Sequence, residues 1–371
     1  MIGAAPPTPE QLAADLLDAA LVRVAELSSV VARIQVELPD LDSVAGLSEA
    51  GVPRPHRTAP QLRGTIDGPF CEHASTLTAA VALRQIGPRP GNATELATIA
   101  CEAAIPDPCF WTPQLPHRYR LKLELACGND VLARHERWLG LRPLSVRERG
   151  FWFDGAGWVL RATDRSLVPG VELSHWREAH LAMLVRSPDD ALCEAASQFG
   201  VLLVADIAGT SQQIVEQLQR LSRHAAVGLA IVDPSESLDF DVRRAAGGII
   251  LIQRVGKTSG ATAGLSSSAF PQVSSVRPQA LPSGATGSAG AIPLYESQPW
   301  PQALLVDACD PDQFANLAAT SSLPLLVECT TEACASTAAA RSACDTLQAD
   351  TAGRGHIAGF LVRAAVDSSK H

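Results

Sequence analysis

The spacing of apolar residues changes twice along the chain, and the first pattern, over residues 1–32, is helical. Thr8 and Pro9 have the residue types of an N-cap and a first helical position. Apolar residues follow near a 3.6-residue spacing: Leu12, Leu16, Val22, Ala25 and Val30. We therefore expect an amphipathic N-terminal helix that packs on the rest of the protein.

Residues 33–147 have the alternation of half-buried strands. In Tyr119–Leu125 the apolar side chains fall on one face and the charged side chains on the other, as an antiparallel sheet with one buried face requires. Similar short segments, separated by Pro, Gly and Asn, are Leu62–Ile66, Ser75–Leu83, Glu95–Ala103 and Val131–Leu139. This region is predicted to be an all-β sandwich.

Residues 151–366 contain short apolar strands without strict alternation, each followed by a polar or helical stretch. We expect eight strands: Trp158–Thr163, Leu181–Arg186, Val201–Asp206, Val227–Val232, Gly248–Ile252, Ala303–Asp307, Leu325–Cys329 and Ile357–Val362. Eight βα units close naturally into a (β/α)8 barrel. Residues 257–298 are rich in Ser, Gly, Ala and Pro, which predicts a long loop in place of one barrel helix. The barrel is therefore expected to be small for this fold and to lack some of its helices.

The composition and charge of the chain argue against nucleic acid and membranes as partners. The chain has 371 residues with a formal net charge of −9, so it lacks the basic surface that binds nucleic acid or an anionic membrane. It has no apolar run of the roughly 18 residues that cross a bilayer and no signal-peptide pattern at its start, which favours a cytoplasmic location. The nine cysteines include no Cys-x-x-Cys pair, so we expect no disulfide framework, no metal site and no cofactor.

Single motifs give little chemistry. Gly256-Lys257-Thr258 resembles the end of a phosphate-binding loop, but Leu251 stands where that loop needs its first glycine. A Gly-x-Ser-x-Gly nucleophile elbow does not occur. Trp176 and His180, just before the second predicted barrel strand, are candidates for substrate binding at the barrel rim, although a lone histidine is more often structural.

Four segments, taken in order, resemble glycoside hydrolase family 2. The family's Trp-x-Pro and Pro-Tyr-Leu-Tyr pattern is similar to Phe110–Leu121, and its Phe-Gly-Phe-Arg is similar to Leu139–Arg142. In the family, barrel strand one begins with an Asn-Gly and Leu-Arg-Gly pattern, and Phe153–Arg161 is similar to it. The family's Leu-Cys-Asp segment, which connects a helix to the next strand, is similar to Leu192–Leu203. Each motif is weak alone, and the specificity comes from their order and spacing. The resemblance implies an immunoglobulin-like sandwich that leads directly into a (β/α)8 barrel.

The same resemblance implies roles for particular residues. Pro324–Glu328 is similar to the strand that presents the catalytic nucleophile, which would be Glu328. The family's Asn-Glu pair, whose glutamate is the acid/base, is replaced by Pro234-Ser235, with Glu236 one residue late. The family's Asn-x-x-Arg on strand two keeps its arginine as Arg186, a candidate for substrate binding.

We therefore expect a catalytically impaired glycoside hydrolase-like protein, a pseudoenzyme that binds carbohydrate or serves as a scaffold. One alternative is an active retaining glycosidase with Glu328 as nucleophile and Glu236 or Asp206 as acid/base. Another is a protein-interaction module without sugar binding. Retention needs two carboxyl groups about 5–5.5 Å apart, so a covered Glu328 favours the scaffold and an open carboxyl pair favours the enzyme.

Overall fold

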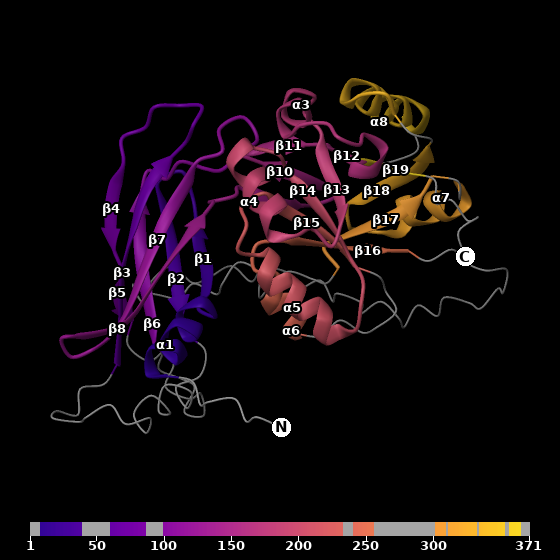
Figure 1. The fold of residues 1–371 in the computed structure, drawn as a ribbon. Coiled ribbons are helices and arrows are strands. Elements are labelled where there is room, and N and C mark those ends of the chain that lie inside the picture. Colours follow the sequence, from indigo (N-terminus) through magenta and orange to yellow (C-terminus); the bar gives the residue numbers. More distant parts are fainter. Residues whose placement is uncertain are drawn as a thin grey trace, which may run out of the picture.

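The computed structural model describes residues 8–38, 60–86, 99–232, 240–255, 301–308, 311–331, 334–352 and 356–364. An antiparallel sandwich forms the first part of the chain and a closed parallel barrel the second (Figure 1). This is the fold class that the sequence predicts.

The N-terminal helix is shorter than expected. α1 (Pro9–Asp18) begins as predicted, with the Thr8 hydroxyl accepting a hydrogen bond from the Gln11 amide, but it ends at Asp18. The residues that follow form strand β1 (Leu21–Leu27), so the expected helix over residues 1–32 is wrong in its second half. The sandwich therefore starts at Leu21, before the predicted boundary at residue 33. α1 packs against β7 and β8 at the edge of the sandwich.

The sandwich consists of two antiparallel four-stranded sheets. One has the order β1-β2-β6-β5 and the other β4-β3-β7-β8. Their strands are β2 (Val31–Glu37), β3 (Pro60–Phe70), β4 (Ala79–Ala82), β5 (Arg84–Ile86), β6 (Ala100–Pro106), β7 (Arg118–Cys127) and β8 (Asp130–Leu139). The alternation predicted for β7 is present, since every second side chain from Tyr119 to Leu125 is buried. These side chains and those of β2 and β6 form one hydrophobic core.

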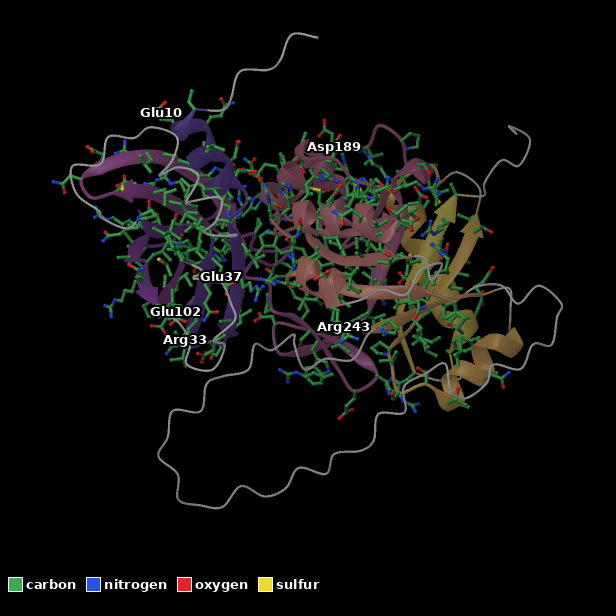
Figure 2. All side chains as sticks on the ribbon, turned by 90° about the horizontal axis from the view of Figure 1, so that it is seen from below. Glu10, Arg33, Glu37, Glu102, Asp189 and Arg243 are labelled. Carbon is green, nitrogen blue, oxygen red and sulfur yellow. The ribbon has the colours of Figure 1, made fainter. Side chains whose placement is uncertain are left out.

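The outer face of the first sheet is charged. Arg33 on β2 forms ion pairs with Glu26 on β1, at 2.8 Å, and with Glu102 on β6, at 3.1 Å. Figure 2 shows Arg33, Glu37 and Glu102 together on this face. Because Arg33 and Glu26 are nearly half exposed, these pairs contribute little to stability. They keep the face polar.

A three-stranded antiparallel sheet joins the sandwich to the barrel. It comprises β9 (Leu144–Arg147), β10 (Gly150–Phe153) and β11 (Ala156–Trp158). Asp154 and Gly155 link β10 to β11, both with positive φ, at 51° and 76°. This is the turn that an Asp-Gly pair favours in a two-residue hairpin.

The barrel closes through eight parallel strands in chain order, as predicted. They are β12 (Leu160–Asp164), β13 (Ala182–Arg186), β14 (Leu203–Ile207), β15 (Val227–Val232), β16 (Ile250–Arg254), β17 (Ala303–Asp307), β18 (Leu325–Thr331) and β19 (Ile357–Ala364). β12 pairs with β19, which completes the ring. β14 and β15 are adjacent and parallel, which is the arrangement that the eight-strand prediction requires.

Helices follow most of the strands. They are η1 (Arg165–Leu167), α3 (Leu173–Glu178), α4 (Asp190–Phe199), α5 (Ser211–Leu221), α6 (Phe240–Ala246), α7 (Pro311–Thr320) and α8 (Thr337–Thr351). Several are opened by side-chain caps, including Asp189 for α4 and Thr210 for α5. The predicted long loop over residues 257–298 lies outside the described residues.

Several contacts hold the sandwich against the barrel, and those of Trp111, Gly140 and Arg142 lie at the junction of the two parts. The buried Trp111 side chain donates a hydrogen bond to the Ser197 carbonyl of α4 at 2.8 Å. The chain at Gly140 passes so close to the barrel that a Cβ there would lie 2.2 Å from the Cβ of Ala225. Arg142 donates to the carbonyls of Ala225, at 2.7 Å, and Gly248, at 3.1 Å. The segment Leu139–Arg142, which resembles a family motif, is therefore the junction of the two parts.

Candidate active site at the carboxyl end of the barrel

The two predicted carboxylates of the described barrel lie at the same end. Asp206 is the fourth residue of β14, and Glu328 is the fourth residue of β18. In both strands the three preceding residues are buried and apolar, and the acidic side chain is the first polar one. The carboxyl ends of the eight strands form one face, where the active sites of barrel enzymes are located. The structure thus brings Glu328 and Asp206 together.

Two arginines connect these carboxylates. Arg254 ends β16, and its guanidinium contacts Glu328 Oε2 at 2.7 Å and Asp206 Oδ1 at 3.7 Å. Arg363 lies on β19, and its Nη1 is 2.9 Å from Asp206 Oδ2 while its Nε contacts Glu328 Oε1. Each arginine therefore contacts both acids. We call Asp206, Arg254, Glu328 and Arg363 the barrel-end cluster.

The barrel-end cluster lies inside the barrel mouth. Its members come from β14, β16, β18 and β19, and contacts between strands that are not neighbours must pass through the barrel interior. Side chains from alternate strands form such layers in parallel barrels. The Glu328 side chain is 11% exposed and the Asp206 side chain 16%. Both carboxylates are thus largely withdrawn from water.

This arrangement limits what Glu328 can do. A glycosidase nucleophile attacks with a carboxylate oxygen that faces the substrate. Both Glu328 oxygens are engaged instead, Oε2 by Arg254 and Oε1 by Arg363. Asp206 is held by the same two guanidinium groups.

The remaining predicted site residues are not part of this cluster. Arg186 pairs in register with Asp206 on the neighbouring strand, but its side chain is exposed. Trp176 is fully buried on α3, and His180 is exposed in the turn before β13. The amino end of β13 is the opposite end of the barrel from Glu328, so the structure does not bring Trp176 and His180 to the expected rim. Glu236 lies outside the described residues.

Arg254 and Arg363 are the members that the sequence prediction missed. Each follows an apolar strand in the same way as Asp206 and Glu328, in Ile250–Arg254 and Phe360–Arg363. A charged residue after the apolar part of a barrel strand could therefore have indicated both arginines. They were missed because a glycosidase site calls for acidic residues at these positions, and arginine is basic.

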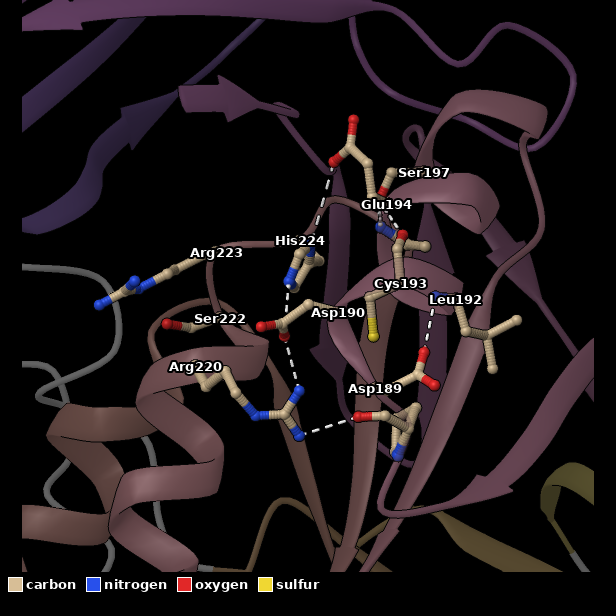
Figure 3. Close-up of polar contacts among 12 residues, drawn as sticks. Asp189, Asp190, Leu192, Cys193, Glu194, Ser197, Arg220, Ser222, Arg223 and His224 are labelled. Atoms are coloured by element: carbon tan, nitrogen blue, oxygen red, sulfur yellow. Dashed lines mark hydrogen bonds and ion pairs between the residues drawn. The ribbon is translucent and has the colours of Figure 1, made fainter. Parts of the chain in front are cut away.

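A second polar cluster lies outside the barrel, on α4 and the turn after α5 (Figure 3). His224 Nε2 is 3.2 Å from Asp190 Oδ1, which also accepts from Arg220 at 2.6 Å. His224 Nδ1 faces Glu194 at 4.0 Å, and Glu194 pairs with Arg118 of the sandwich at 2.5 Å. This cluster fastens two barrel helices to each other and to the sandwich.

The protonation states of the second cluster suit that structural role. Burial would raise the pKa of Asp190, but hydrogen bonds from Arg220 and His224 outweigh it and hold the pKa below its usual value. Burial raises the pKa of the adjacent Cys193 thiol to about 12. Because the thiolate is the nucleophilic form, Cys193 is inert here.

The described residues meet neither the requirements of a metal site nor those of a membrane-spanning helix. Among them, no three His, Cys, Asp or Glu side chains gather in a group that could hold a metal ion. None of the described helices is long and apolar enough to cross a membrane.

Comparison with known proteins gives a match in structure but none in sequence. Neither a protein-family model nor a curated protein matches the chain. A glycosyl hydrolase family 2 member from Bacteroides cellulosilyticus aligns with a TM-score of 0.54 and 12% identity, over 93% of this chain and 45% of that structure. Parabacteroides merdae beta-glucuronidase aligns with a TM-score of 0.53 and 12% identity, over 92% and 46%. A putative beta-galactosidase from Bacteroides fragilis gives 0.52 and 12%, over 92% and 54%.

The chain spans about half the length of these solved structures. At 12% identity the similarity concerns the fold and not the activity. Within that limit it agrees with the order of sandwich and barrel observed here. The chain has the sandwich-and-barrel fold of glycosyl hydrolase family 2 structures, as its sequence motifs implied.

Proposed function

We propose that this protein keeps the glycosidase fold without ordinary glycosidase activity, and that its barrel serves as a scaffold with carbohydrate as the ligand class. The observation that carries the proposal is the barrel-end cluster, in which Arg254 and Arg363 each contact both Glu328 and Asp206. The four formal charges cancel inside the barrel mouth. A substrate would have to break these ion pairs before either carboxylate could act.

The energetics support a structural role for the cluster. Separating a largely buried carboxylate from its guanidinium partners leaves charges uncompensated, at a cost of about 3–5 kcal/mol per broken pair. A glycosidase would add that cost to its reaction barrier. The sequence adds a second argument, since Pro234-Ser235 replaces the acid/base pair of the similar family. Losing a general acid alone slows such a reaction by roughly 10²–10⁴-fold.

Aryl glycosides test the proposal most sharply, because dinitrophenolate leaves without being protonated and so reports on a nucleophile alone. We would assay dinitrophenyl β-glucuronide and β-galactoside, the substrate types in the names of proteins with this fold. The matched control for Glu328→Gln is Asp345→Asn, which removes an ion-paired carboxylate from the outer surface of α8. We expect no turnover by the native protein. Cleavage that Glu328→Gln abolishes and Asp345→Asn leaves intact would overturn the proposal.

An active retaining glycosidase is the second candidate, and one observation favours it. Glu328 and Asp206 share two guanidinium partners, so a rearrangement of Arg254 and Arg363 would free both acids at once. In that case Asp206→Asn should stop hydrolysis of alkyl glycosides while sparing dinitrophenyl glycosides. If Glu236→Gln has this effect and Asp206→Asn does not, the glutamate next to Ser235 is the acid/base.

A further inference from the structure

The small sheet β9–β11 has one buried and one open face. Residues directly opposite each other in an antiparallel pair point to the same side. Phe151 on β10 lies opposite Val146 on β9 and Trp158 on β11, and Phe151 is 1% exposed. This face packs against the barrel core. Near it, a Cβ on Gly228 would come within 3.1 Å of Leu144, which places the sheet over the amino end of the barrel.

The other face carries an aromatic ring and a guanidinium group. Trp152 alternates with Phe151 along β10 and lies opposite Ser145 and Gly157. Arg147, two residues beyond Ser145 on β9, shares this face, and its Cζ is 5.2 Å from the centre of the Trp152 ring. That distance is within the range of cation–π contacts. Trp152 and Arg147 thus form a pair on the surface of the sheet.

Trp152 differs from the other described tryptophans in its surroundings. Trp111 and Trp176 are fully buried, and Trp138 packs against Phe70 and Arg118. Trp158 contacts two phenylalanines of the inner face. Among the described residues, Trp152 makes a ring contact with Arg147 and with no other aromatic or cationic side chain.

The neighbouring positions leave room beside the Trp152 ring. Among the residues that the structure describes, a Cβ built on Gly157, directly opposite on β11, would meet no atom within 4 Å, and the same is true of Gly150. Arg147 lies on the β9 side, so the side of the ring that faces β11 is open. This face therefore presents one aromatic ring and one cation side by side.

We propose that Trp152 and Arg147 bind one uronic acid unit of a polysaccharide, through a single carboxylate–guanidinium contact that does not require the extended basic surface which the chain, with a net charge of −9, lacks. The apolar C–H face of a pyranose ring can stack on the indole, which presents a large flat apolar surface. The guanidinium offers paired donors that match a carboxylate. Arg147 has no ion pair with any described residue, so these donors are available. The acidic groups on the same hairpins are Glu148 in the β9–β10 turn and Asp154 in the β10–β11 turn, and Arg149 adds a second positive charge.

This site goes beyond the proposed function, because it lies at the amino end of the barrel and the barrel-end cluster lies at the carboxyl end. Polysaccharide binding at Trp152 requires no carboxylate chemistry. Hydrolysis of aryl glycosides therefore neither supports nor weakens it. Hydrolysis assays test the proposed function, and binding titrations test the site at Trp152.

The test is a titration with oligogalacturonate, followed by calorimetry and by tryptophan fluorescence. Because glutamine cannot form charge-assisted hydrogen bonds to the carboxylate, we expect Arg147→Gln to weaken binding about tenfold or more. Trp152→Ala should weaken it to a similar extent, while Trp152→Phe, which keeps an aromatic face, should retain most of the affinity. Arg149→Gln is the matched control, because it removes the same charge two residues away and should change affinity less than about twofold.

A second ligand separates the contribution of the carboxylate from that of the ring. Methyl-esterified oligogalacturonate keeps the pyranose rings and loses the charges, so it should bind the native protein as weakly as oligogalacturonate binds Arg147→Gln. The proposal is wrong if oligogalacturonate does not bind, or if Trp152→Ala binds it as the native protein does. It is also wrong if Arg149→Gln weakens binding as much as Arg147→Gln, since the attraction would then be a general effect of charge.

Discussion

Arg363 on β19 and Asp206 on β14 meet across the inside of the barrel, with 2.9 Å between Nη1 and Oδ2, although 157 residues and two strands separate them. Neither residue could reach the other along the barrel wall. The ion pair therefore exists only in the closed barrel, and with Arg254 and Glu328 it ties four strands together at their carboxyl ends. Closing the barrel therefore also places Asp206 and Glu328 beside the guanidinium groups that balance their charges.

Removing one guanidinium from this cluster should be costly. Arg363→Met leaves Asp206 and Glu328 with Arg254 as their shared partner, and an uncompensated buried charge costs about 3 kcal/mol or more. Urea denaturation followed by circular dichroism would measure the loss in free energy of unfolding. Arg186→Met is the control, because this arginine also lies near the end of a barrel strand but is exposed. Its expected effect is below about 0.5 kcal/mol, and equal losses in the two variants would contradict a stabilising role for the cluster.

The barrel was predictable because each of its strands carries its own signal. Val201–Asp206 and Leu325–Cys329 are short apolar runs that end in a charged or polar residue, and that pattern does not depend on distant partners. The β1 strand was missed for a related reason. Leu21–Leu27 is so short that Val22 and Ala25 also fit the helical spacing begun by α1, and the two periods cannot be distinguished over seven residues.

The candidate site was predictable only in part. The positions of Glu328 and Asp206 follow from where the apolar part of each strand ends, so the sequence predicts their location at the same end of the barrel, while their catalytic roles stay predictions. Their pairing with Arg254 and Arg363 depends on which strands face each other after closure, and the linear sequence does not contain that relationship. The sheet β9–β11 was missed because strands of three or four residues are too short to show a period.

The junction at Gly140 predicts a steric effect with a specific remedy. Gly140→Ala would put a Cβ 2.2 Å from the Cβ of Ala225, so the sandwich and the barrel must move apart. Overpacking of this kind costs about 1–3 kcal/mol, which the urea midpoint would report. The double variant with Ala225→Gly should recover most of the loss. Gly150→Ala, whose Cβ would meet no atom of the described residues within 4 Å, should have little effect. A double variant no more stable than Gly140→Ala would exclude the steric explanation.

His135 on β8 predicts a pH dependence of stability. Burial lowers its pKa below the ordinary value of 6.5, with Arg137 and Arg223 acting in the same direction and Asp18, at 3.9 Å, opposing them. The unfolded chain therefore binds the proton more readily, and the folded state loses stability as the pH falls from about 6.5 towards the lowered pKa. In His135→Gln this component is absent. Urea midpoints at pH 7 and pH 5 should differ less in the variant than in the native protein, and an equal difference would show that His135 does not contribute.

Arg142 predicts that lysine cannot replace arginine at the junction. Its guanidinium donates to three backbone carbonyls at the amino ends of β15 and β16, those of His224, Ala225 and Gly248, and burial lowers its pKa to about 10. A lysine ammonium lacks the planar fork that reaches acceptors from two strands. Arg142→Lys should therefore lose about 1–3 kcal/mol, the cost of leaving buried carbonyls without donors. Thermal unfolding would measure this, with the exposed Arg149→Lys as control. If both lysine variants unfold at the native temperature, charge alone is sufficient at Arg142 and the forked geometry is not required.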